Sequence, residues 1–413
     1  MASLLEIPIE LLRMFYSAAQ EIPWPFLLLG LASLTFSFCV FVYASLYLLA
    51  PLPRPALAVE KSYITTAPDG STTAAHKLPC WHDAWLAQRK KTEAAGDFSE
   101  DTGAIDAAEV EMSVVIPAYN EEERLEEMLQ EAVEYLDAEY GRSPISAKAN
   151  GQSNGNGNGN GNGNGNLTQR NVAKPRAPGI GGYEILLVND GSRDRTVEVA
   201  LAFSRKHALH NIMRIVSLKE NRGKGGAVTH GFRHTRGAYT VFADADGASK
   251  FGDLTKLVEG CKQVADEGGR SVAVGSRAHL VGSEAVVKRS ALRNTLMHSF
   301  HLLLRLLTPP KTSQIRDTQC GFKLFSRAAL PHIIPYMHAE GWIFDVEMLM
   351  LAESAPAVSS SESSNSGVPV SEVPIGWKEV GGSKLNVMWD SLGMAWGLAL
   401  LRASWMIGVY RRR

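Results

Sequence analysis

The sequence predicts an α/β protein with a Rossmann-like, mostly parallel, doubly wound sheet, a transmembrane helix near the N-terminus and amphipathic membrane-associated helices at the C-terminus. Three observations support this fold class. Short apolar runs alternate with segments of helical spacing in the middle of the chain, which is typical of a parallel sheet. Residues 26–50 contain no charged side chain. Residues 391–413 are rich in apolar and aromatic side chains, which favour the bilayer interface.

The composition narrows the classes of function. The 413 residues are enough for one large catalytic domain with appendages. The 43 acidic and 42 basic residues nearly cancel, so no basic excess indicates a nucleic-acid partner. The four cysteines include no Cys-x-x-Cys pair, which gives no sign of a zinc site and fits a reducing compartment.

The N-terminal part is predicted to anchor the chain in a membrane. Residues 1–25 are expected to be a lumenal or interfacial segment, and residues 26–50 exceed the roughly 20 apolar residues that span a bilayer. A cleaved signal peptide would have a cationic front, whereas this front is acidic on balance. The flanking charges place the bulk of the protein in the cytosol by the positive-inside rule. They are Glu6, Glu10 and Glu21 before the span, and Arg54, Lys61 and Lys77 after it.

The catalytic domain is expected at residues 112–390, after a linker at 51–111. Two insertions, the Asn/Gly-rich residues 150–182 and the serine-rich residues 354–371, have compositions that cannot bury a core and are expected to be disordered. An arginine in mid-span is costly in lipid, so Arg402 favours a pair of short interfacial helices at 391–413. The predicted strands are residues 113–117, 184–188, 212–218, 239–243 and 272–275.

Polar or charged loops follow four of these strands. Because right-handed crossovers bring the carboxyl ends of parallel strands to one edge, we expect the loops to converge on a ligand. The loops contain residues 119–121, 190–192, 222–224 and 244–246.

The strongest sign of a site is the acid pair Asp244 and Asp246 at the end of a buried strand. If the extended geometry continues, alternation points both side chains the same way. Two carboxylates then suit Mg²⁺ or Mn²⁺ held jointly with substrate phosphates. A polar turn is the alternative, since Asp-Gly is a common turn pair.

The other loops suit a nucleotide or a phosphate. Residues 223–226 (GKGG) would let the backbone approach a ligand beside the Lys224 ammonium, or would simply form a tight turn. They are not a Walker loop, which needs Ser or Thr after the lysine. Asp190 could accept a hydrogen bond from a base or a ribose, and Arg277 suits a phosphate oxygen or a neighbouring acid.

Four motifs together resemble the family 2 glycosyltransferases with the GT-A fold. They are residues 113–121 (SVVIPAYNE), 189–192 (NDGS), 221–225 (NRGKG) and 243–247 (ADADG). Four later motifs resemble the members of that family that glucosylate dolichyl phosphate in the endoplasmic reticulum. They are residues 275–278 (GSRA), 316–325 (RDTQCGFKLF), 344–347 (FDVE) and 379–385 (EVGGSKL). The resemblance covers residues 112–390 apart from the insertions, and departs at Asn189, where the family usually has a second Asp.

The resemblance implies inverting transfer of glucose from UDP-glucose to dolichyl phosphate, with Mg²⁺ or Mn²⁺ at Asp244 and Asp246. It implies that the nucleotide sugar is bound by Pro117, Tyr119, Glu121, Asp190, Lys224 and Asp244. It implies that the acceptor phosphate is bound by Arg277, Arg289 and Lys323. A phosphate monoester with a second pKa near ~6 is already anionic, so a general base is optional. Asp317 is the first candidate for one and Asp345 the second.

Two other functions are left open by the residues. A mannosyltransferase that uses GDP-mannose and dolichyl phosphate would carry the same early loops. A membrane-anchored nucleotide-binding scaffold without activity belongs to a different class, but it would be expected to lose one acid of the pair, and both are present. A polysaccharide synthase would need several membrane spans, and one is clear.

Overall fold

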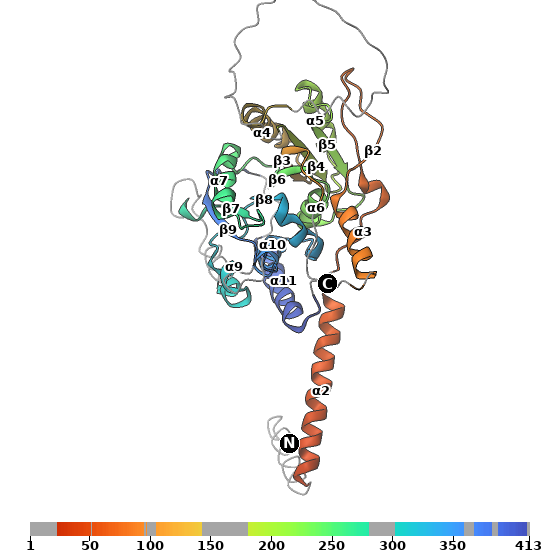
Figure 1. Ribbon diagram of the computed structural model, residues 1–413, viewed down its shortest axis with the longest axis vertical. Coiled ribbons are helices and arrows are strands. Elements are labelled where there is room, and N and C mark those ends of the chain that lie inside the picture. Colours follow the sequence, from red (N-terminus) through yellow and green to blue (C-terminus); the bar gives the residue numbers. More distant parts are fainter. Residues whose placement is uncertain are drawn as a thin grey trace, which may run out of the picture. The chain divides into compact units, whose positions relative to one another are not determined.

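The computed structural model (Figure 1) describes residues 23–50, 52–94, 96, 105–142, 181–280, 302–358, 367–381 and 387–410. The chain divides into two compact units. One comprises Met1–Ala50 and Ala399–Arg411, and the other comprises Pro51–Leu398 with the last two residues. Outside the described residues lie Arg289, the 382–386 part of the last motif, residues 150–180 of the first predicted insertion and residues 359–366 of the second.

In the larger unit, the described residues form a seven-stranded sheet in the order β5-β4-β3-β6-β8-β7-β9. The neighbours pair in parallel, except that β8 runs antiparallel to both β6 and β7. The prediction of a mostly parallel sheet is therefore confirmed. The strands are β3 (Val110–Ala118), β4 (Tyr183–Asn189), β5 (Met213–Ser217), β6 (Gly237–Ala243), β7 (Val272–Ser276), β8 (Phe322–Ser326) and β9 (Val370–Pro374).

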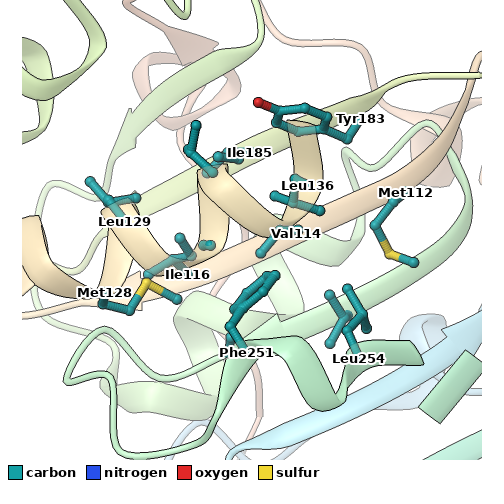
Figure 2. Packing of buried hydrophobic residues seen from close by; sticks show 14 of the residues in the cluster. Met112, Val114, Ile116, Met128, Leu129, Leu136, Tyr183, Ile185, Phe251 and Leu254 are labelled. Atoms are coloured by element: carbon teal, nitrogen blue, oxygen red, sulfur yellow. The ribbon is translucent and has the colours of Figure 1, made fainter. Parts of the chain in front are cut away.

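Helices flank this sheet, and α4 (Leu125–Glu139) buries one apolar side against it. In α4, buried residues recur at intervals of three and four, from Leu125 to Leu136. Figure 2 shows this side of α4 packed with residues of β3 and β4 and with Phe251 of the 3₁₀ turn η3 (Phe251–Asp253). Each such fully buried side chain contributes about 1.5–3 kcal/mol. After α2 (Trp24–Leu49), the described helices are α3 (Trp81–Ala94), α4 (Leu125–Glu139), α5 (Thr196–Lys206), α6 (Gly223–Phe232), α7 (Leu254–Val264), α9 (Pro310–Gln314), α10 (Phe344–Glu353) and α11 (Val387–Ile407). The described 3₁₀ turns are η1 (Ala58–Lys61), η3 (Phe251–Asp253), η4 (Ala278–Leu280), η5 (Arg327–His332) and η6 (Ile334–Tyr336).

Residues 52–94 are a folded part of the larger unit, so the prediction of a linker at 51–111 is wrong there. Ile64 bridges Ile215 of β5, with backbone hydrogen bonds of 3.0 and 2.9 Å. The indole of Trp81 is buried and donates to Phe232 O at 2.7 Å. A short hairpin of β1 (Ser62–Tyr63) and β2 (His76–Lys77) precedes α3. The prolines suggested a linker, whereas buried aromatic residues hold the segment in place.

By length and composition, α2 (Trp24–Leu49) is the one described helix able to cross a membrane. One such helix is consistent with a single-pass membrane protein. The C-terminal prediction of two short helices is wrong, because residues 387–407 form a single helix, α11. In its part within the larger unit, Leu398 is buried whereas Trp389 and Trp396 are exposed.

Candidate active site

Loops meet at the edge of the sheet where β3, β4, β5 and β6 end. The N–H of Asp190, after β4, donates to Ala118 O of β3 at 2.8 Å. The N–H of Asn120 donates to Ser192 Oγ at 2.9 Å, and the N–H of Arg222, after β5, donates to Asp190 Oδ1 at 2.7 Å. The predicted convergence is therefore confirmed for these loops.

The acid pair follows β6, but the chain does not stay extended. β6 ends at Ala243, and the chain turns at Asp246 before Gly247, whose φ is +68°. Strand alternation therefore does not align Asp244 and Asp246, and that part of the prediction is wrong. The two carboxylates still interact: burial first, and then the charge of Asp244, raises the pKa of Asp246. A cation bound by both carboxylates would offset the cost of burying the Asp246 charge and its repulsion by Asp244.

Lys224 lies beside the acid pair. Its Nζ is 2.6 Å from Asp244 Oδ1, and the two side chains are 17% and 30% exposed. Burial lowers the pKa of Lys224, but the charges of Asp244, Asp345 and Asp246 and the hydrogen bond to Asp244 together outweigh burial, so the pKa is raised. Lys224 is therefore a permanent cation at neutral pH, next to the position where two carboxylates could hold a metal.

The glycines beside Lys224 allow another segment of the chain, residues 339–344, to pack closely against them. A Cβ on Gly223 would lie 2.7 Å from Glu340 O, and one on Gly225 would lie 2.5 Å from the Cβ of Phe344. Gly226 N–H donates to Glu340 O at 3.1 Å. The sequence suggested that these glycines admit a ligand, whereas the described contacts explain them by close packing of the segment 339–344 on the start of α6.

Asp190 is a buried carboxylate, 3% exposed, at the end of β4. Burial raises its pKa to about 6, although hydrogen bonds from the backbone of Arg222 and Gly223 oppose this shift. Its backbone oxygen accepts from the Asn221 side chain at 3.0 Å. Asp190 is therefore held in a fixed position, and its protonation changes just below neutral pH.

Arg277 and Asp317 form a two-point ion pair. Arg277 Nε and Nη2 donate to the two oxygens of Asp317 at 2.7 and 2.8 Å, and the Arg277 N–H adds a third bond at 2.9 Å. Burial raises the pKa of Asp317, but the hydrogen bonds and the charge of Arg277 outweigh burial, so the pKa is lowered. A carboxylate held in this way is a weak base, so the pair is better suited to presenting the partly exposed guanidinium of Arg277.

Lys323 and Asp345 form a second pair below the surface. Lys323 is 0% exposed and Asp345 is 2% exposed; the Lys323 ammonium contacts Asp345 and also donates to Cys320 O at 2.7 Å. Burial raises the pKa of Asp345, and the Lys323 charge opposes it. Lys323 therefore has its acceptors inside the protein, and it does not present its charge to an acceptor phosphate as the sequence implied.

Three further predicted residues line the first loop. Pro117 is the half-buried residue before the end of β3, and Tyr119 and Glu121 follow the strand. The Glu121 carboxylate pairs with Arg124 at 2.6 Å, and its N–H donates to Thr196 Oγ1 at 2.8 Å.

Sequence reasoning missed Gly321. A Cβ built on it would lie 1.9 Å from Oδ2 of Asp244, and the Asp244 N–H donates to Gly321 O at 3.2 Å. Gly321 lies within a motif that we recognised, but the pattern alone does not show that its missing side chain leaves room for an acid 77 positions earlier (321 − 244).

The acid pair fits a divalent metal that is shared with a substrate. No group of three His, Cys, Asp or Glu residues that could hold a metal ion occurs in the described parts of the chain. Mg²⁺ is usually held by one or two carboxylates together with substrate phosphates and water, and the oxygen ligands here are of the kind that Mg²⁺ and Mn²⁺ prefer. Asp244 and Asp246 supply the two carboxylates that such a shared site needs.

Comparison with known proteins defines the class. The model described as Glycosyl transferase family 2 matches residues 172–334. Dolichyl-phosphate beta-glucosyltransferase of Saccharomyces cerevisiae is 36% identical over 378 residues, which cover 90% of this chain and 91% of the relative. The chain therefore belongs to glycosyl transferase family 2, and the resemblance recognised in the sequence is confirmed.

Other relatives share the name of the yeast protein. Dolichyl-phosphate beta-glucosyltransferase of Drosophila melanogaster is 40% identical over 307 residues, covering 74% of this chain and 78% of the relative. That of Homo sapiens is 34% identical over 340 residues, covering 82% and 89%. Among solved structures, glucosyl-3-phosphoglycerate synthase of M. tuberculosis aligns with a TM-score of 0.43 at 17% identity, covering 71% of this chain and 81% of that one.

Proposed function

We propose that this protein transfers glucose from UDP-glucose to dolichyl phosphate with inversion, giving dolichyl β-D-glucosyl phosphate for assembly of the N-glycan precursor. The observation that carries the proposal is similarity over most of the chain to relatives that bear the name of this activity. The site supports it, because a carboxylate pair, a lysine and a buried aspartate lie at the strand ends where nucleotides bind in open α/β sheets.

On the donor side, Asp190 accepts a hydrogen bond from the nucleoside, and the loop of Pro117, Tyr119 and Glu121 lies against the nucleotide sugar. Lys224, whose Nζ lies 2.6 Å from Asp244 Oδ1, places a positive charge at the diphosphate. A Mg²⁺ or Mn²⁺ ion held by Asp244 and Asp246 would supply Lewis-acid stabilisation of the leaving diphosphate.

On the acceptor side, Arg277 binds the phosphate of dolichyl phosphate, and Asp317 holds the guanidinium in position. One phosphate oxygen attacks the anomeric carbon from the face opposite UDP. The bond from that carbon to the diphosphate oxygen breaks, and its electron pair leaves with UDP. The nucleophile is already anionic, since the second pKa of a phosphate monoester is near ~6, so neither Asp317 nor Asp345 needs to remove a proton. Arg289 stays a proposed phosphate ligand, and Lys323 is proposed to hold Asp345 and the 320–321 backbone.

A transfer assay distinguishes this function from its alternatives. Membranes containing the protein are incubated with dolichyl phosphate and either radiolabelled UDP-glucose or radiolabelled GDP-mannose, and lipid-extractable label is measured. We expect label from UDP-glucose alone to enter lipid. Label from GDP-mannose would identify the mannosyltransferase instead, and nucleotide binding without any transfer would favour the inactive scaffold. Membranes without the protein are the control.

Donor binding is expected to weaken in acid because of Asp190. Its pKa of about 6 means that the carboxylate, the form that accepts a hydrogen bond, is lost as the pH falls below that value. The dissociation constant of UDP-glucose should then rise about tenfold per pH unit. Equilibrium binding at pH 5–8 measures this, and UDP-glucose is the suitable probe because its diphosphate has no titrating group in this range. Asp190→Asn should bind more weakly, with no such slope; a flat profile for the parent would contradict the role of Asp190.

The location that follows is the endoplasmic reticulum membrane, crossed once by α2, with the catalytic domain in the cytosol. The proposal rests on the basic residues after the span and the acidic ones before it. The sequon Asn166–Leu167–Thr168 provides a test, because lumenal enzymes would modify an accessible sequon. We expect no mobility shift on endoglycosidase treatment, in the parent or in Asn166→Gln. A glycan at Asn166 would place the domain in the lumen.

A further inference from the structure

We propose that the segment 52–61, just after the anchor helix, is a working part of the donor site, in which it holds the loop 219–222 that positions Asp190. The proposal rests on the proposed function for the role of Asp190. It assigns positioning roles to Arg54 and Glu60, which the sequence analysis had placed in a linker.

Arg54 binds the loop 219–222 from one side. Its Nη2 donates to Asn221 O at 3.1 Å, and its Nη1 lies 3.6 Å from Glu220 Oε2. Its Nε donates to Glu340 Oε2 at 3.1 Å, and its backbone N–H reaches Glu340 Oε1 at 3.3 Å. One arginine therefore connects the loop with the segment that packs on the start of α6.

Glu60 binds the same loop from within the protein. Its side chain is buried, and Oε1 accepts the N–H of Lys219 at 3.0 Å. Oε2 accepts the N–H of Leu57 at 2.9 Å, and the Glu60 carbonyl accepts from His230 Nε2 of α6 at 2.8 Å. The segment 52–61 is thus attached both to the loop 219–222 and to α6.

Arg222 joins these contacts to Asp190. Its guanidinium is 5% exposed and pairs with Glu340, contacts the Arg54 carbonyl and lies 3.9 Å from Glu60. Its backbone N–H donates to Asp190 at 2.7 Å. Removing one partner of a buried ion pair destabilises the fold, because the other charge is left buried without its partner. A change in the segment 52–61 is therefore transmitted to Arg222, whose backbone N–H is one of the donors to the Asp190 carboxylate.

The test uses the full-length protein in detergent and measures UDP-glucose and GDP-mannose binding, both Michaelis constants and the melting temperature. Arg54→Ala removes a side chain that is 46% exposed, together with its bonds to Asn221 and Glu340. We expect about fivefold weaker donor binding, with the Michaelis constant for dolichyl phosphate unchanged. Glu60→Gln keeps the shape and removes the charge, and we expect roughly tenfold weaker donor binding. If Arg54 and Glu60 had only a structural role, the variants would lower the melting temperature and would change the Michaelis constants for donor and acceptor alike.

The matched control is Asp83→Asn. It breaks the Lys61–Asp83 ion pair of 2.6 Å, which involves the same segment without touching the loop 219–222, and should leave donor binding unchanged. Parent-like donor binding by Arg54→Ala, or an equal loss in Asp83→Asn, would overturn the proposal. Transfer of glucose to dolichyl phosphate by the parent is measured separately. A failure of the proposed reaction can therefore be told apart from a failure of the positioning role of the segment 52–61. If the parent binds GDP-mannose and not UDP-glucose, the three variants are compared with the parent in GDP-mannose binding.

Discussion

Alanine in place of Asp246 is expected to lower the rate of glucose transfer about a thousandfold while the protein stays folded. Loss of a metal-binding carboxylate costs several kcal/mol of transition-state stabilisation, and about 1.4 kcal/mol corresponds to each factor of ten. Folding should change little. Burial and the charge of Asp244 already disfavour the ionised form of Asp246, so its removal relieves repulsion and loses one hydrogen bond from Ala248 N–H.

The measurement is kcat in Mg²⁺ and in Mn²⁺, together with the melting temperature. Asp69→Ala is a suitable control, because Asp69 is an exposed acid whose hydrogen bonds are confined to Ser71. It should match the parent in both quantities. A kcat of Asp246→Ala close to that of the parent would rule out the acid pair as the metal site.

Gly321→Ala is expected to lower transfer about a hundredfold or more, although it adds one methyl group. The new Cβ would lie 1.9 Å from Asp244 Oδ2, far inside van der Waals contact, so the carboxylate has to move. Asp244 would then lose its position beside Lys224, now 2.6 Å away. Misplacing a reacting or metal-binding group by about 1 Å can cost two orders of magnitude.

Gly252→Ala is the matched control, since a Cβ there would meet only Tyr135 Cδ2 at 3.9 Å, an ordinary contact. We expect it to keep the parent's activity. Metal affinity measured with UDP present should fall in Gly321→Ala and stay constant in Gly252→Ala. If Gly321→Ala transfers glucose normally while Asp244→Ala does not, the close approach has no functional meaning.

The parallel part of the sheet could be predicted because its strands are buried on both faces. Such strands appear as continuous apolar runs, as at 184–188, and right-handed crossovers leave few ways to connect them. β8 was missed because it contains Lys323, whose burial depends on Asp345 of another element. β9 was missed because Val370–Pro374 is short, alternating and adjacent to a serine-rich tract.

The site could be predicted at the level of loops but not of partners. The residues Asp190, Lys224 and Asp244 stand in the loops that follow predicted strands, and strand order brings these loops together. The partner of Arg277 is Asp317, 40 positions away, and that of Lys323 is Asp345, 22 positions away. Several charged residues could have served in each case. Which charges face a ligand and which neutralise each other depends on tertiary packing, which no local pattern contains.

The bridge between Ile64 and Ile215 also bears on self-association. β5 is the first strand of the sheet, and an uncovered strand edge is a template on which other chains can pair and aggregate. Ile64 occupies part of that edge with two backbone hydrogen bonds to Ile215. A truncated protein that began at Met112, where sequence alone places the domain, would expose this edge together with the apolar surface that Trp81 covers. A soluble catalytic fragment should therefore begin near residue 52, where the fold rather than the motif begins.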